Sequence, residues 1–246
     1  MLRRPDALLL DFGGVLADAP PQRPAPPDLV LRLYNLVGGA LTPGEIQRSL
    51  TEGHAAYARW RDEDWPDELP REEVWERFVI AGWPRTAKAA VRAVVGRLSY
   101  EWAWRDGWAL RPGIAELLDA VDLPMAVVSN TLSGAAHRDF LAKSGVGGRF
   151  RAQIYSDEAG VRKPNPQMIW YATSELGVPA ARCWFVGDSR RRDVLCARRA
   201  EAAAAVLMRS PRTDREDPAG WPEPDVVVED GYELSRLLET GRPGTV

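Results

Sequence analysis

The chain has 246 residues, and its 32 lysines and arginines against 35 aspartates and glutamates give a net charge of −3. This balance argues against a general binder of nucleic acids or anionic membranes, because no basic excess is present. The two cysteines, Cys183 and Cys196, are too few for a disulfide framework, so we expect a cytoplasmic protein. No apolar run reaches the roughly 20 residues of a membrane span.

The stretch LLLDFGGVL at residues 8–16 predicts a buried parallel strand that ends at Asp11. Ligands of open α/β sheets bind beyond the carboxyl ends of the strands. Asp11 is therefore a candidate nucleophile, metal ligand or cap of the next element. Gly13 and Gly14 would let the backbone turn sharply beside a bound group.

The segment that follows predicts helices. Residues 17–28 are rich in proline and can form neither helix nor central strand, so they are a surface linker or the hinge of a lid. We expect Asp28 to cap a helix over 29–36, and residues 42–45 (TPGE) to form the capping box of another. Further helices are expected at 71–81 and 85–96. Residues 51–108 also hold seven tryptophans, for which core packing is favoured over substrate contact.

The rest of the chain alternates between predicted strands and helices. Such alternation indicates βαβ units and an α/β fold with a parallel sheet. The expected strands cover residues 124–130, 150–156, 183–188, 204–208 and 225–228. The expected helices cover residues 114–121, 166–176, 193–203 and 232–238.

Polar residues stand at the predicted ends of these elements. Asp11 and Asp188 each follow a strand, and two such carboxylates suit a hard cation such as Mg²⁺. The hydroxyl of Ser129 and the charge of Lys163 suit a phosphoryl group. Together these residues predict metal-assisted phosphoryl transfer with an aspartate nucleophile.

Four short motifs occur in order along the chain: DFGGVL at 11–16, VVSNT at 127–131, KPNP at 163–166 and GDSRRRD at 187–193. In this series the sequence resembles the haloacid dehalogenase superfamily of hydrolases. The resemblance implies a Rossmann-like core of residues 1–16 and 110–246, with an all-helical cap of residues 17–109 inserted after the first motif. It also implies a small phosphorylated metabolite as substrate. From the charge balance we expect no nucleic-acid or membrane partner, and we expect a monomer or homodimer.

The resemblance assigns the catalytic roles as well. Asp11 would attack phosphorus and form an aspartyl-phosphate. Ser129 and the backbone amide of Asn130 would hold phosphoryl oxygens, and Lys163 would neutralise charge on the nucleophile and the phosphoryl group.

The implied metal site consists of Asp11, Asp188 and the backbone carbonyl of Gly13 around Mg²⁺, with Asp193 in support. Gly13 is also a departure from the family pattern, because phosphatases of the family usually carry an aspartate there as general acid and base. Three consequences stay open: a leaving group that needs little protonation, another proton donor such as Asp18 or a water, or poor turnover.

Two other functions compete with a phosphatase. In a 2-haloacid dehalogenase the aspartate attacks carbon without a metal; Ser129 and Asn130 would suit that reaction, but the retained Asp188 argues against it. A non-catalytic binding protein is the second alternative, against which Asp11, Lys163 and Asp188 together argue. The isolated His54 and His137 are expected at the surface or in the cap.

Overall fold

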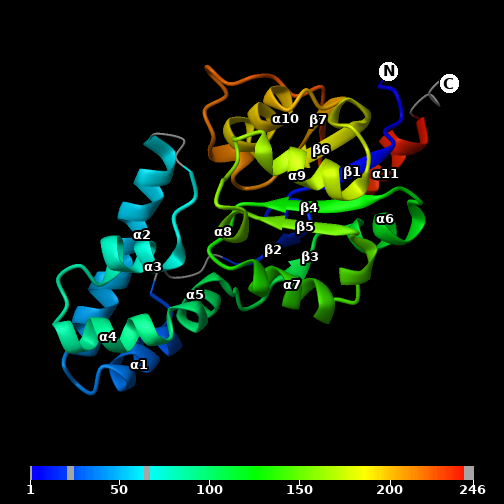
Figure 1. Cartoon of the computed structure of the whole chain (residues 1–246). Coiled ribbons are helices and arrows are strands. Elements are labelled where there is room, and N and C mark those ends of the chain that lie inside the picture. The colour runs from blue at the N-terminus through cyan, green and yellow to red at the C-terminus, as the bar shows by residue number, and fades with distance from the viewer. Residues whose placement is uncertain (1, 21–24, 64–66, 241–246) are drawn as a thin grey trace.

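The computed structural model describes residues 2–20, 25–63 and 67–240 (Figure 1). Its centre is a six-stranded sheet in the order β5-β4-β1-β6-β7-β8, in which every neighbouring pair is parallel. The strands are β1 (Ala7–Leu10), β4 (Met125–Ser129), β5 (Ala152–Tyr155), β6 (Cys183–Gly187), β7 (Ala204–Met208) and β8 (Val226–Val228). The predicted α/β fold is confirmed.

Helices cover both faces of the sheet, which explains why the central strand β1 is apolar throughout. Leu8 and Leu10 belong to one core, with α6 (Ile114–Ala120), α7 (Gly134–Lys143) and α11 (Gly231–Thr240). Leu9 belongs to the other core, with α9 (Gln167–Leu176) and α10 (Leu195–Arg199). Short helical turns complete this part: η2 (Gly147–Arg149), α8 (Ser156–Ala159), η3 (Ala180–Arg182) and η5 (Thr213–Arg215).

The helical region between β2 and β3 has a separate core and lies beside the sheet in Figure 1. It consists of α1 (Pro27–Leu36), α2 (Pro43–Glu63), α3 (Arg71–Val74), the π-helix η1 (Trp75–Val79), α4 (Arg85–Ala93) and α5 (Val95–Ala103). Trp75, Trp83 and Trp102 are buried in its core, as predicted. Trp65 and residues 21–24 of the proline-rich connector lie outside the described residues.

A two-stranded antiparallel ribbon joins the two regions. Its strands, β2 (Ala17–Asp18) and β3 (Ala109–Leu110), stand at the two places where the chain crosses between sheet and helices. We propose on this basis that residues 17–109 form a cap, and that residues 1–16 and 110–246 form the core.

Of the two helix caps predicted from the sequence, one is confirmed and one is wrong. The capping box at Thr42 is confirmed, since Glu45 accepts a hydrogen bond from the Thr42 amide at 2.7 Å. The prediction for Asp28 is wrong: α1 begins at Pro27, so Asp28 lies inside the first turn and Pro26 precedes the helix. Proline supplies a suitable φ at a helix start without any side-chain cap.

Two further predictions need correction. The helix expected over 193–203 begins earlier, as the π-helix η4 (Arg190–Val194), and α10 ends at Arg199. His137 is not a surface residue. It is buried on α7 and stacks on the Phe12 ring, with 3.7 Å between the ring centroids. No helix in the described part of the chain is long and apolar enough to cross a membrane.

Candidate active site

The predicted site residues converge at the carboxyl edge of the sheet. Asp11 directly follows β1, Asp188 directly follows β6, and Ser129 is the last residue of β4. These three strands are neighbours, with β1 in the middle. The chain builds strands outward on both sides of β1, and ligands of such sheets bind at this point of divergence.

Buried ion pairs link Asp11, Lys163 and Asp193. Lys163, from the loop between α8 and α9, places Nζ 2.8 Å from Asp11 Oδ1 and 2.7 Å from Asp193 Oδ1. The other oxygen of Asp193 accepts the backbone amides of Asp188 and Ser189, each at 3.0 Å. Asp193 therefore orients both Lys163 and the loop that carries Asp188.

Asn130 holds the backbone on which Lys163 stands. Its Oδ1 accepts the Lys163 amide at 2.8 Å, and its Nδ2 donates to the Lys163 carbonyl at 3.0 Å. The side chain of Asn130 is thus used in positioning Lys163. Ser129 is buried beside it at the strand end, where its hydroxyl is proposed to hold a phosphoryl oxygen.

The charges set the protonation states of these groups. Burial by itself would raise the pKa of Asp11, but the cations of Lys163 and Arg212 hold that pKa below its ordinary value. Burial by itself would lower the pKa of Lys163, but the negative charges of Asp11 and Asp193 outweigh the effect of burial and raise that pKa above its ordinary value. Asp11 is therefore an ionised carboxylate beside a protonated lysine, which is the form that a nucleophile requires.

Three carboxylates meet in a geometry that fits a divalent cation. Oxygens of Asp11, Asp188 and Asp193 lie within 4.8 Å of one another, and all three side chains are buried. Burial raises the pKa of Asp188 to about 6, partly opposed by Arg212. Hard oxygen ligands of this kind are those that Mg²⁺ prefers, so the residues fit the metal that the sequence implies.

The turn after Asp11 requires glycine at position 14 but has room for a side chain at position 13. Gly14 has a φ of +77°, and a Cβ there would lie 2.1 Å from Asp188 Oδ2. A side chain would thus strain the backbone and collide with the acidic cluster. A Cβ on Gly13, by contrast, meets no heavy atom within 4 Å. There is therefore space for a side chain at this position, where related phosphatases are expected to carry their general acid.

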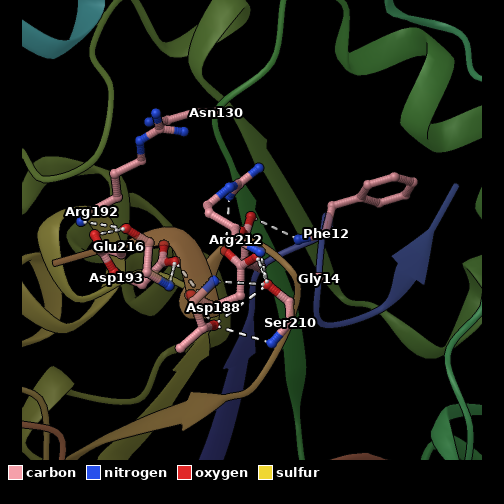
Figure 2. Close-up of polar contacts among 12 residues, drawn as sticks. Phe12, Gly14, Asn130, Asp188, Arg192, Asp193, Ser210, Arg212 and Glu216 are labelled. Atoms are coloured by element: carbon pink, nitrogen blue, oxygen red, sulfur yellow. Dashed lines mark hydrogen bonds and ion pairs between the residues drawn. The ribbon is translucent and has the colours of Figure 1, made fainter. Parts of the chain in front are cut away.

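The loop after β7 contributes residues that sequence reasoning missed (Figure 2). Arg212 Nη1 donates to Asp188 Oδ1 at 2.8 Å, and Ser210 Oγ donates to Asp188 Oδ2 at 2.7 Å. Thr213 Oγ1 donates to the Asp188 carbonyl at 2.6 Å. These residues form no sequence motif, and their place just after a predicted strand was the one feature of the sequence that could have identified them. The pairing of β6 with β7 brings them to Asp188.

Glu216 is a second residue that the motifs did not reveal. Its carboxylate accepts the amides of Arg190 and Arg191 at 2.7 and 2.9 Å and the Ser189 hydroxyl at 2.9 Å. It therefore satisfies the free amides at the start of η4, where negative charge is favourable.

Asp18, a candidate for the missing proton donor, has a structural partner. It lies 3.3 Å from Arg111 Nε in the ribbon region. The same guanidinium donates to the carbonyls of Gly14, Arg209 and Glu229. Arg111 thus ties the turn after Asp11 to the loops after β7 and β8.

Comparison with known proteins gives a family. The haloacid dehalogenase-like hydrolase family matches residues 5–201. A curated phosphoglycolate phosphatase of Xanthomonas campestris pv. campestris is 36% identical over 81 residues, which are 33% of this chain and 36% of that protein. The chain thus spans about a third of the length of this relative.

Solved structures share the fold along nearly the whole chain. The HAD-hydrolase YfnB from Bacillus subtilis, bound to magnesium, has a TM-score of 0.64 at 19% identity and covers 96% of this chain and 99% of its own. The 2-haloacid dehalogenase from Pseudomonas syringae pv. Tomato DC3000 has a TM-score of 0.65 at 16% identity, covering 97% and 99%. At these identities the likeness shows the fold alone, but the match over residues 5–201 is decisive: the chain belongs to the haloacid dehalogenase-like hydrolase family.

Proposed function

We propose that the protein is a Mg²⁺-dependent phosphatase that hydrolyses a small phosphate monoester through an aspartyl-phosphate on Asp11. The observation that carries this proposal is the buried contact of Lys163 with both Asp11 and Asp193, beside Asp188. It holds the pKa of Asp11 below its ordinary value, and Asp188, the second carboxylate proposed to hold the cation, lies beside it. The phosphoglycolate phosphatase activity of the Xanthomonas relative supports the same reaction class.

The chain's own residues account for the proposed steps. An oxygen of Asp11 attacks phosphorus, the bond from phosphorus to the leaving oxygen breaks, and the leaving oxygen takes up a proton to become the alcohol. A water molecule then attacks the phosphorus of the aspartyl-phosphate, which releases phosphate and restores Asp11. Ser129, the Asn130 amide and Lys163 would hold the phosphoryl oxygens as charge develops on them. Asp11, Asp188 and the Gly13 carbonyl would hold Mg²⁺, supported by Asp193, and the bound ion would neutralise further phosphoryl charge.

A dehalogenase uses its aspartate on carbon, and the shared fold does not separate the two reactions. Asp188 does favour the phosphatase. It is buried, and Ser210 and Arg212 orient its two oxygens at the same edge as Asp11. A displacement on carbon without a metal needs no carboxylate to hold a cation.

The test is phosphate release from a panel of phosphate esters, with Mg²⁺ and with a chelator. We expect release that requires the metal and that falls by at least about 10³-fold in Asp11→Asn, because the nucleophile is lost. Asp18→Asn is the matched control: it removes a neighbouring carboxylate that pairs with Arg111, and it should retain turnover if Asp18 is not the proton donor.

Turnover that survives in Asp11→Asn would overturn the nucleophile assignment. If no ester is hydrolysed, chloride release from 2-chloroacids would identify a dehalogenase, and the absence of both reactions would indicate a binding protein.

A further inference from the structure

The carboxylate oxygen Oδ2 of Asp188 lies against two backbone segments from different loops (Figure 2). The first is the turn after β1, where a Cβ on Gly14 would stand 2.1 Å from this oxygen. The second is the loop after β7, from which Ser210 Oγ donates a hydrogen bond to the same oxygen at 2.7 Å. In the sheet, β6, which leads to Asp188, lies between β1 and β7. The direction of this carboxylate therefore depends on where both loops lie.

One guanidinium group binds the backbone of both segments. Arg111 Nη1 donates to the Gly14 carbonyl, and Arg111 Nη2 donates to the Arg209 carbonyl at 2.7 Å. Arg209 directly precedes Ser210 in the chain. Nη2 also donates to the Glu229 carbonyl at 3.0 Å. Because a guanidinium is planar and its donors stand in a fixed fork, these hydrogen bonds set the spacing between the turn and the loop.

Arg111 is itself held in place where the chain returns from the helical region. It directly follows β3, and its amide donates to the Leu16 carbonyl at 3.0 Å. Its side chain is only 9% exposed, and Asp18 Oδ2 lies 3.3 Å from its Nε atom, so that its charge has a partner. Arg111 therefore acts on the turn and the loop through hydrogen bonds rather than as a free charge.

We propose that Arg111 is a positioning residue for Asp188: it fixes the two backbone segments that orient this carboxylate. The inference rests on the proposed phosphatase function, in which Asp188 and the Gly13 carbonyl would hold Mg²⁺. Gly13 directly precedes Gly14, so the hydrogen bond to the Gly14 carbonyl restrains the turn that carries both residues. Groups that orient the ligands of a metal typically contribute roughly 10–100-fold to metal affinity.

Mg²⁺ binding to variants of Arg111 tests the proposal. We expect Arg111→Ala to raise the Kd for Mg²⁺ by roughly 10–100-fold in titration calorimetry, because Asp188 loses its fixed direction. The sign of the change is informative, since removing a positive charge that acted only through its field would lower the Kd. Arg111→Lys keeps the charge but lacks the planar fork, so it should recover only part of the affinity. If Arg111→Ala does not fold, Arg111→Lys carries the same tests with a smaller increase in Kd.

Turnover should separate the metal from the substrate. In Arg111→Ala, the Mg²⁺ concentration that gives half-maximal phosphate release should rise with the Kd. The KM for the ester at saturating Mg²⁺ should stay within about twofold, because Ser129 and Lys163, which would hold the phosphoryl group, stand on β4 and on the loop between α8 and α9.

Arg149→Ala is the matched control. Arg149 also donates to two backbone carbonyls, those of Leu118 at 2.6 Å and Val121 at 3.0 Å. It is the last residue of η2, which precedes β5, so it lies at the amino edge of the parallel sheet, opposite the proposed site. This variant should lower the Tm and leave the Kd for Mg²⁺ unchanged.

Hydrogen exchange of the metal-free protein tests the positioning role without the ion. Arg111→Ala should speed amide exchange by at least about tenfold in residues 13–17 and 210–214, the two segments that the guanidinium holds, because their local opening becomes easier. Exchange in α9, which does not contact Arg111, should stay as in the wild type.

The outcomes separate this inference from the phosphatase. If esters are hydrolysed but Arg111→Ala binds Mg²⁺ at least as tightly as the wild type, or if Arg149→Ala weakens binding equally, the positioning role is overturned and the phosphatase stands. If the wild type binds no Mg²⁺ and hydrolyses no ester, the proposed function fails. Faster exchange confined to the two segments would then still support the positioning of Asp188 by Arg111, and unchanged or uniformly faster exchange would overturn it.

Discussion

At the scale of single residues, Gly13 and Gly14 are neighbours with opposite tolerance for a side chain. Gly13 faces open space and Gly14 faces Asp188 at a positive φ. We expect Gly13→Asp to fold normally and to raise kcat/KM for alkyl phosphates, since general acid–base help is worth roughly 10²–10⁴-fold. Gly14→Ala should lose stability and Mg²⁺ binding. Measured rates across leaving groups of graded pKa, together with thermal unfolding, check both variants.

The wild-type enzyme should also show a steep loss of rate with poorer leaving groups, because Gly13 cannot donate a proton. A flat dependence would mean that another group donates it. A folded Gly13→Asp protein with unchanged rates on alkyl phosphates would contradict the expectation for that position.

Arg212 places a positive charge against Asp188, a proposed metal ligand, where a bound cation would compete with it. Its guanidinium lies 2.8 Å from Asp188 Oδ1, and Asp188, Asp11 and Asp193 raise the pKa of Arg212 against the effect of burial. Removing this charge should strengthen cation binding, and we expect Arg212→Gln to lower the Kd for Mg²⁺ by about tenfold, the equivalent of about 1.4 kcal/mol. Titration calorimetry checks this, with exposed Arg215→Gln as the control. An unchanged or weaker affinity would show that Arg212 does not compete with the ion.

At the scale of elements, the short helix α8 is one of the places where the helical region contacts the sheet region. Asp157 on α8 accepts the Gly134 amide at 3.0 Å and lies 3.3 Å from Arg71 on α3. Glu68 reaches the same segment, since its amide donates to the Gly160 carbonyl at 3.2 Å. The two regions therefore meet at this short turn and at the loop that leads to Lys163, and also between α5 and α7, where the Tyr100 hydroxyl donates to Asp139 Oδ2 at 2.8 Å.

Asp157 gives this contact a pH dependence. Burial raises its pKa from 3.8 to about 6, although the Gly134 amide and Arg71 oppose the shift. Between these values the folded protein keeps a proton that the unfolded chain has lost, so stability from this group falls as the pH rises through the window. The free energy of unfolding of Asp157→Asn minus that of wild type should therefore increase from pH 4 to pH 6 and level off above.

Urea unfolding of both proteins at each pH measures this difference. Asp119→Asn, which alters an exposed carboxylate, is the matched control. A difference for Asp157→Asn that falls with rising pH would mean that the ion pair with Arg71 outweighs burial.

At the scale of the whole molecule, the acidic cluster should couple metal binding to global stability. Mg²⁺ at 100 times its Kd would add about 2.7 kcal/mol to the free energy of unfolding, which is roughly 5–10 °C in Tm for a chain of this size. We expect this rise in Tm with Mg²⁺, its reversal by a chelator, and its loss in Asp188→Asn. Asp214→Asn, an exposed acid paired with Arg209, should keep the response. An equal rise in Asp188→Asn would place the ion elsewhere.

The strands and the acids that follow them could be predicted from the sequence because both depend on local pattern. Leu8, Leu9 and Leu10 are apolar because helices cover both faces of β1, and the next residue, Asp11, must emerge at the sheet edge. Strand ends therefore located Asp11 and Asp188, and the four motifs added Lys163 and Asp193. Local capping patterns were less reliable, since proline at α1 replaced the expected Asp28 cap.

The partners of those residues could be found only in the tertiary structure. Arg212 and Glu216 lie more than 20 residues beyond Asp188 and reach the site because β7 pairs with β6. His137 is buried because α7 packs against Phe12, and Glu68 pairs with Arg162 because one region rests on the other. The sequence by itself determined the chemistry at the strand ends, where periodicity and chain direction are local. The tertiary structure decided the charges around that chemistry, because strand order and the packing of the helical region bring distant segments together.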